Sequence, residues 1–191
     1  MTSRYDKPEV SFLDRRSGLL FHLSSLPGPF GTGGLGRNAE RFADFLKDSG
    51  FSVWQVLPIT PTDDSSYYSP YSGRSAFAGN RMFISPEKLA EDGLLDPGIL
   101  EGYRRLGQET SADFRYADQM IKELVPIAWQ RFKGDSGKYS ALAVDYKDFV
   151  KRESFWLLDH ALFTLLKSKF ENLPWNEWPE AFALRDRDTI E

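Results

Sequence analysis

The chain has 191 residues, 41% hydrophobic and 15% aromatic, with a formal net charge of −4 and no cysteine. This composition supplies a hydrophobic core and excludes disulfides and thiolate metal sites, while the mild charge offers no basic surface for nucleic acid. No apolar run is long enough to cross a membrane or to serve as a secretory signal, so we expect a cytoplasmic protein without nucleic-acid or membrane partners.

Two short segments near the start of the chain predict neighbouring parallel strands. Residues 18–23 form a continuous apolar run, which is typical of a strand buried on both faces of a sheet, and residues 52–57 predict a second buried strand. Between them, Asn38 predicts the N-cap of a helix that ends at Gly50. A strand, a helix and a strand of these lengths predict one right-handed βαβ unit.

The loop that follows the second strand, residues 54–80, combines aromatic, proline and small polar residues. In its centre, residues 67–71 read Tyr-Tyr-Ser-Pro-Tyr, which places flat rings beside hydroxyl groups as sugar-binding surfaces do. The neighbouring Asp63 and Asp64 are interpreted as turn formers rather than as a catalytic pair. The sequence therefore predicts a ligand-binding loop after the second strand.

The second half of the chain has helical periodicity. Helices are expected near residues 86–91, 97–106, 116–132 and 146–170, the third with a break at Pro126. Residues 173–179 predict a non-helical turn, in which Trp175 and Trp178 are interpreted as packing anchors, and residues 184–191 predict the approach to another element. Since two strands make no complete sheet, the pattern favours part of a larger α/β barrel and leaves open a small α-rich fold with a two-stranded core.

Residues 31–36 satisfy the pattern G-x-G-x-x-G between a strand and a helix. In dinucleotide-binding folds the first glycine follows the strand almost at once, whereas here residues 24–30 intervene. The second strand also ends at Leu57 and Pro58, without an acidic residue for a ribose. We therefore interpret these glycines as turn and packing residues and expect no cofactor.

Four segments resemble, in order and with credible spacing, the N-terminal part of the 4-α-glucanotransferases, also called amylomaltases or disproportionating enzymes, of glycoside hydrolase family 77. These segments are RSGLLFHLSSLPGPFGTGGLG (16–36), WQVLPITPTDD (54–64), SPYSGRSAFAGN (69–80) and PWNEWPEAFALRDRD (174–188). The resemblance implies a retaining enzyme that transfers a segment of a 1,4-α-glucan to the 4-hydroxyl of an acceptor glucose or glucan. It also implies that the catalytic carboxylates lie on later barrel strands, so we expect no catalytic residue in this chain and no transferase activity of the isolated chain.

The resemblance also selects site residues in the loop. Ser69, Pro70 and Tyr71 match the family's Ser-Pro-Tyr, which implies that Tyr71 lies beside the sugar at the cleavage point and that Ser69 is a polar contact to the donor glucan. The preceding segment is two residues longer than the commonest family pattern, so Tyr67 and Tyr68 are only secondary candidates. His22 is a further secondary candidate, with a core histidine as the alternative.

The fold prediction is therefore α/β, the N-terminal portion of a (β/α)8 TIM barrel. Residues 1–84 are expected to start the barrel and to carry the donor-side loop, and residues 85–191 are expected to form a mainly helical inserted subdomain. The expected partners are α-1,4-glucans and maltooligosaccharides, with no metal. A stand-alone glucan-binding or structural module without catalysis is the alternative.

Overall fold

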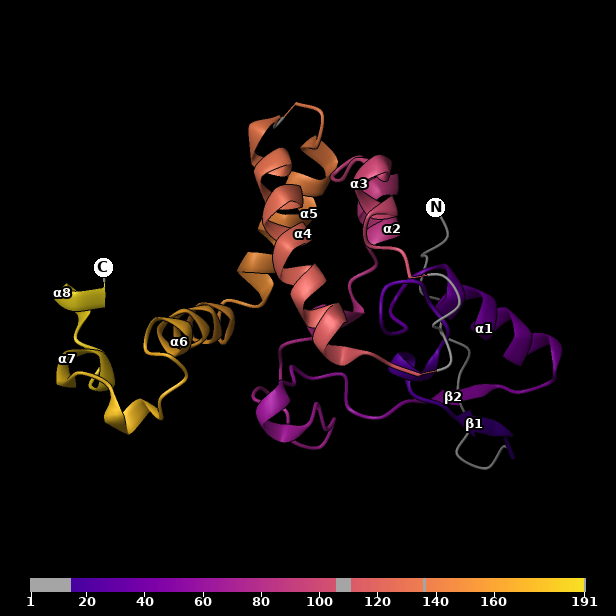
Figure 1. Ribbon diagram of the computed structural model, residues 1–191, viewed down its shortest axis with the longest axis horizontal. Coiled ribbons are helices and arrows are strands. Elements are labelled where there is room, and N and C mark those ends of the chain that lie inside the picture. Colours follow the sequence, from indigo (N-terminus) through magenta and orange to yellow (C-terminus); the bar gives the residue numbers. More distant parts are fainter. Residues whose placement is uncertain (1–14, 106–110, 136, 191) are drawn as a thin grey trace.

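The structure, a computed structural model, describes residues 15–105, 111–135 and 137–190 (Figure 1). The strands are β1 (Gly18–Leu20) and β2 (Val53–Gln55). The α-helices are α1 (Arg37–Asp48), α2 (Pro86–Glu91), α3 (Pro97–Glu101), α4 (Phe114–Gly134), α5 (Ser140–Arg152), α6 (Leu157–Lys169), α7 (Glu180–Ala183) and α8 (Arg187–Ile190). Short 3-10 turns lie at Leu23–Ser25, Asp64–Ser66, Arg81–Phe83 and Trp175–Glu177.

The predicted parallel pair of strands is present, joined through α1. β1 pairs in parallel with β2, with Gly18 opposite Val53 and Leu20 opposite Gln55. Each strand is three residues long, shorter than predicted, because the chain turns into a 3-10 helix at Leu23 on one side and approaches Pro58 on the other. The mixed α/β character expected from the sequence is thus confirmed.

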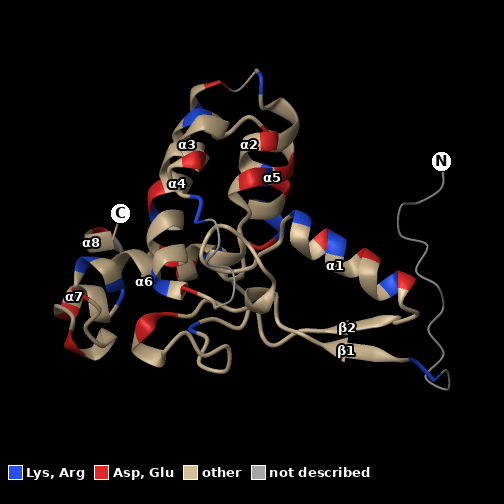
Figure 2. Ribbon diagram, turned by 45° about the vertical axis from the view of Figure 1, so that its right-hand side comes forward, with Lys and Arg blue, Asp and Glu red and all other residues tan. Residues whose placement is uncertain are grey.

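Helix α1 covers one face of the two strands. The Phe42 ring lies 5.1 Å from the Phe21 ring and 4.9 Å from the Trp54 ring, measured between centroids. On the opposite face, Leu20 is 56% exposed and Val53 is 42% exposed. The expectation of strands buried on both faces is therefore wrong for the described part of the chain, where helices cover only the Trp54 side. Figure 2 shows charged residues along α1 and none on β1 or β2.

The start of α1 differs from the prediction. Gly36, rather than Asn38, occupies the N-cap position, and the Asn38 side chain donates a hydrogen bond to the Pro27 carbonyl at 2.6 Å. Asn38 thus attaches the helix to the glycine-rich loop. Gly50 has φ +79°, so its predicted role in ending the helix is confirmed.

The main hydrophobic cluster lies where α2, α3 and α4 meet the glycine-rich loop. Its buried members are Phe30, Leu95, Leu100, Met120, Ile121, Leu124 and Ala128. The predicted break at Pro126 is wrong, since α4 runs without interruption from Phe114 to Gly134. Leu124 and Ala128 anchor the helix in this cluster on both sides of the proline, and their burial outweighs the one backbone hydrogen bond that a proline removes.

Helix α2 has the predicted bounds, and the side chain of Ser85 caps it by accepting a hydrogen bond from the Lys88 amide at 3.2 Å. α3 begins as predicted but ends at Glu101, and residue 106, its predicted last residue, lies outside the described residues. The predicted helix over 146–170 is wrong, because a turn separates α5 from α6. There, Trp156 donates a side-chain hydrogen bond to Glu153 at 2.7 Å and stacks on the Phe77 ring of the loop.

The aromatic turn after α6 contains a single 3-10 turn. Trp178 is buried, with its ring 5.7 Å from Phe163 and 5.6 Å from Phe170, so its packing role is confirmed. Trp175 is 59% exposed, so the same interpretation is wrong for that residue. Figure 1 places α6, α7 and α8 at the opposite end of the molecule from the two strands. Within the described residues, no helix has the length and apolar character to cross a membrane.

Candidate functional site

The loop after β2 is closed at its base by hydrogen bonds between its two ends. The Asn80 amide donates to the Ile59 carbonyl at 2.7 Å, and the Arg74 amide donates to the Pro61 carbonyl at 3.1 Å. The buried Asn80 side chain also donates to the Thr62 hydroxyl at 3.0 Å. Because these bonds satisfy the loop's own polar groups, the loop is held in one conformation without regular secondary structure.

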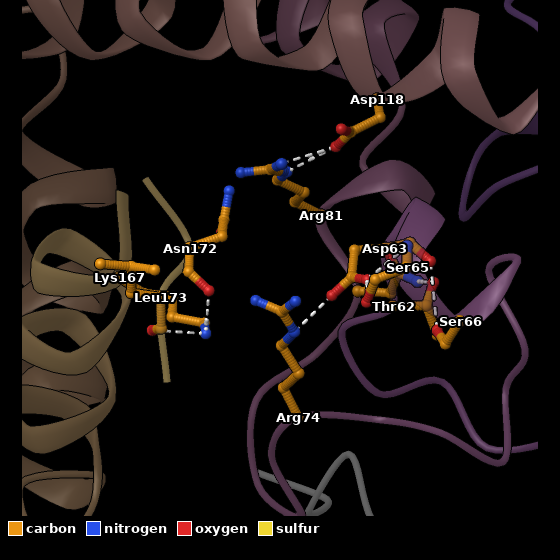
Figure 3. A network of polar contacts seen from close by, with 11 residues as sticks. Thr62, Asp63, Ser65, Ser66, Arg74, Arg81, Asp118, Lys167, Asn172 and Leu173 are labelled. Atoms are coloured by element: carbon orange, nitrogen blue, oxygen red, sulfur yellow. Dashed lines mark hydrogen bonds and ion pairs between the residues drawn. The ribbon is translucent and has the colours of Figure 1, made fainter. Parts of the chain in front are cut away.

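Asp63 organises the first half of this loop (Figure 3). Its Oδ1 accepts hydrogen bonds from the Ser65 amide at 2.9 Å and from the Ser65 hydroxyl at 2.5 Å, while its Oδ2 pairs with Arg74. Asp64 begins the 3-10 turn that follows. The interpretation of Asp63 as a turn former is confirmed, and its carboxylate is already engaged by three donors.

Tyr67 and Tyr68 follow this turn, both with backbone in the left-handed region at φ 52° and 55°. Tyr67 is 94% exposed, so its ring is turned to solvent. The Tyr68 ring stacks on Phe114 at the start of α4, with 5.3 Å between centroids. Burial, and then the nearby charge of Asp118, raise the pKa of the Tyr68 hydroxyl above its usual value.

Ser69 and Tyr71 lie together on the next turn. The Ser72 amide donates to the Ser69 carbonyl at 3.0 Å, and the Tyr71 amide approaches the Ser69 hydroxyl at 3.4 Å. The Tyr71 side chain is 75% exposed. The turn therefore presents an accessible ring beside a hydroxyl group, the combination that the sequence predicted.

His22 lies away from these residues, at the end of β1. It precedes the 3-10 turn, and its ring meets Phe83 edge-on at 5.5 Å between centroids. Its Nδ1 atom is buried and has no hydrogen-bond partner among the described residues. Burial lowers the pKa of His22, which keeps the ring neutral at pH 7. These contacts favour the core-histidine alternative.

A groove of about 680 Å³ lies between both ends of the loop, α4 and α6. Of the five candidates from the sequence, only Tyr68 lines it. Its polar groups include Arg74 from the loop, Arg81 from the 3-10 turn that follows it, Asp118 from α4, and Lys167 and Asn172 from the α6 end (Figure 3). No local pattern in the sequence predicts this groove, because its walls come from three separate segments, residues 61–81, 115–122 and 160–172, which meet only through packing.

Asp118 is the central carboxylate of the groove. Both Nε and Nη2 of Arg81 donate to its Oδ1, at 3.0 and 2.6 Å, and Lys122 pairs with its Oδ2 at 2.7 Å. Burial alone would raise the pKa of Asp118, but these cations outweigh it and lower the pKa, so the carboxylate stays charged. Among the described residues, no group of three histidine or carboxylate side chains is placed to hold a metal ion.

The comparisons with known proteins agree on one family. The sequence pattern of the 4-alpha-glucanotransferases matches residues 21–191. The chain belongs to the 4-alpha-glucanotransferase family. It is 42% identical over 182 residues to the 4-alpha-glucanotransferase of Thermus thermophilus and 40% identical over 176 residues to that of Aquifex aeolicus. These alignments cover 93% and 92% of the chain but 34% of each relative, so the chain spans about a third of their length.

The structure of the chain is also similar to that of a solved member of the family. An amylomaltase from Streptococcus agalactiae in complex with acarbose superposes on this glucanotransferase-family chain with a TM-score of 0.79 at 31% identity. The match covers 93% of the chain and 34% of the amylomaltase. The family resemblance predicted from the four sequence segments is confirmed. In this family member, the Ser69–Tyr71 turn with its exposed tyrosine and the charged groove are two separate features of one loop.

Proposed function

We propose that the chain supplies the donor-side glucan-binding wall of a 4-alpha-glucanotransferase, with Tyr71 and Ser69 as its sugar contacts. Family membership supports the substrate class, α-1,4-glucans and maltooligosaccharides. The observation that carries the proposal is the Tyr71 ring, 75% exposed beside the Ser69 hydroxyl on a loop closed at its base. An aromatic face covers the C–H side of a pyranose, and a neighbouring hydroxyl orients it.

We also propose that the chain forms the N-terminal part of a barrel enzyme. Residues 1–84 begin a (β/α)8 barrel and carry this loop, and residues 85–191 form a mainly helical subdomain. Supporting this, β1 and β2 are parallel, α1 covers one face, and Leu20 and Val53 leave the other face apolar and open. Parallel sheets of this class have both faces covered, as the strands of a barrel do.

The proposed reaction of the whole enzyme moves a glucan segment to the 4-hydroxyl of an acceptor sugar by double displacement. Such retaining chemistry needs a carboxylate nucleophile and a carboxylic acid about 5 Å apart. Two carboxylates that line the groove, Asp63 and Asp118, form ion pairs. Asp63 pairs with Arg74, and Asp118 pairs with Arg81 and Lys122. We therefore assign neither a catalytic role and expect the 191-residue chain by itself to be inactive.

The sugar-contact assignment is tested by titrating the chain with acarbose, followed by calorimetry. Tyr71→Ala removes a ring contact of about 1 kcal/mol, so it weakens binding about five- to tenfold, while Tyr71→Phe keeps most of the affinity. Because the side chain is mostly exposed, the free energy of unfolding changes by less than about 0.5 kcal/mol. Trp175→Ala, which removes another exposed aromatic ring, is the control. Acarbose affinity that is equal in Tyr71→Ala and the unaltered chain would refute the assignment.

The inactivity of the isolated chain is tested with maltotriose. The purified chain is expected to produce no new maltooligosaccharides above a control without protein, as measured by chromatography. The Thermus thermophilus relative serves as the positive control under the same conditions. Transfer products that appear with the chain, and that disappear in Asp63→Asn or Asp118→Asn, would show that its own carboxylates are catalytic.

A further inference from the structure

The groove between the loop, α4 and α6 is cationic in a chain that is anionic overall. Five of its lining side chains are Lys or Arg and three are Asp, whereas the whole chain carries a net charge of −4. The cationic residues are Arg74, Arg81, Arg115, Lys122 and Lys167. Cations gathered in a concave site of this kind attract an anionic ligand.

Arg74 in the loop and Arg81 in the 3-10 turn after it keep free donors that face this groove. A guanidinium has five N–H donors. Arg81 uses its Nε and Nη2 on Asp118, and Arg74 uses its Nε on Asp63. Figure 3 shows both guanidinium groups turned toward the same space, with the side chain of Asn172 across from them. Paired arginine forks of this kind match the oxygens of a phosphate group.

The remaining walls add further donors. Lys167 donates hydrogen bonds to the carbonyls of Asn172 and Leu173, at 2.5 and 2.8 Å, and these bonds hold its ammonium group at the end of α6. An ammonium group has three N–H donors, so one donor of Lys167 is free for a ligand. Among the described residues, the Arg115 side chain has no hydrogen-bond or ion-pair partner, so its charge is not neutralised by a direct contact. The groove thus collects cationic donors from the loop, α4 and α6.

We propose that this groove binds a phosphate group, either free or carried by a small sugar. Its volume of about 680 Å³ lies within the range of small-molecule sites and admits a sugar phosphate. Hydroxyl and amide groups from Ser65, Asn80 and Thr164 also line it and suit a polyhydroxylated ligand. The site is independent of the proposed glucan contacts, because neither Ser69 nor Tyr71 lines the groove.

The proposal is tested by calorimetric titration of the 191-residue chain with glucose 1-phosphate, orthophosphate and glucose. Glucose 1-phosphate is expected to bind and glucose is not. Arg74→Gln and Arg115→Gln each remove a charged donor and weaken binding about tenfold. Arg37→Gln is the control, since Arg37 lies outside the groove and pairs with Glu91 on the surface. Circular dichroism checks that each variant is folded.

Orthophosphate that binds as tightly as glucose 1-phosphate would support the site with free phosphate as its ligand. Tighter binding of glucose 1-phosphate would support a sugar phosphate. The proposal is overturned if neither phosphate binds, if glucose binds as tightly, or if both groove variants bind like the Arg37→Gln control. None of these outcomes depends on acarbose binding at Tyr71, so failure here is distinguishable from failure of the proposed function.

Discussion

Replacing Gly33 by alanine tests why the chain has its glycine-rich segment. A Cβ atom at this position would overlap the Leu23 carbonyl oxygen and lie 2.6 Å from both the Cβ and the carbonyl oxygen of Leu26. Leu23 and Leu26 are buried in the cluster beneath α1. Two of these three atoms belong to the backbone, so no side-chain rotation relieves the overlap. The substitution therefore forces the loop and this cluster apart.

The size of the effect follows from the overlap. Ordinary contact of a Cβ begins at 3.4 Å, so the Leu26 atoms at 2.6 Å lie well inside it. Overpacking a tightly packed site costs about 1–3 kcal/mol, and backbone atoms that cannot rotate away place Gly33→Ala at the upper end. For a chain of this length, a loss of about 3 kcal/mol lowers the melting temperature by roughly 6–12 °C.

Urea denaturation followed by circular dichroism measures this loss. Gly79→Ala is the matched control, because a Cβ at Gly79 would meet no atom within 4 Å, and its free energy of unfolding should stay within about 0.5 kcal/mol of the unaltered chain. If Gly33→Ala were as stable as Gly79→Ala, the close-packing explanation of this glycine would be refuted.

Two further predictions concern the cores. Leu124→Ala, at a fully buried position on α4, should lower the free energy of unfolding by about 2–5 kcal/mol in urea denaturation. The exposed Leu158→Ala should change it by less than about 0.5 kcal/mol, and equal losses would contradict the assignment of Leu124 to the main cluster. Burial holds the pKa of His22 below 6.5, so the unfolded chain binds this proton more tightly and stability is lost as the pH falls through 6.5. Denaturation at pH 7.5 and 5.5 should therefore show a smaller loss for His22→Gln than for the unaltered chain, and equal losses would argue against a partly buried, neutral His22.

Local signals in the sequence predicted local structure well. Ser85 followed by Pro86 predicted the start of α2, and the structure has both the side-chain cap and the proline in the first turn. Gly50 predicted the end of α1, where its backbone is left-handed. Such features depend on a few consecutive residues, so they are readable without knowledge of the rest of the fold.

Predictions failed where distant residues decide the outcome. Pro126 favours a break in any isolated helix, but the core on both sides keeps α4 continuous. In the opposite sense, residues 146–170 have a helical pattern, yet Trp156 leaves the helix to stack on Phe77 of the loop. In both cases tertiary contacts outweigh the local preference of about 1–3 kcal/mol.

Some features of the candidate site were predictable from the sequence, and others depend on the tertiary structure. The sequence by itself determined the parallel pair of strands, the placement of the Tyr71 ring beside the Ser69 hydroxyl and the family, because these depend on consecutive residues and on the order of the four segments. Only the tertiary structure decided that Tyr68 packs on Phe114 and that the groove gathers cations from three parts of the chain. Burial and electrostatic potential depend on which distant side chains become neighbours, and that is established only when the chain has folded.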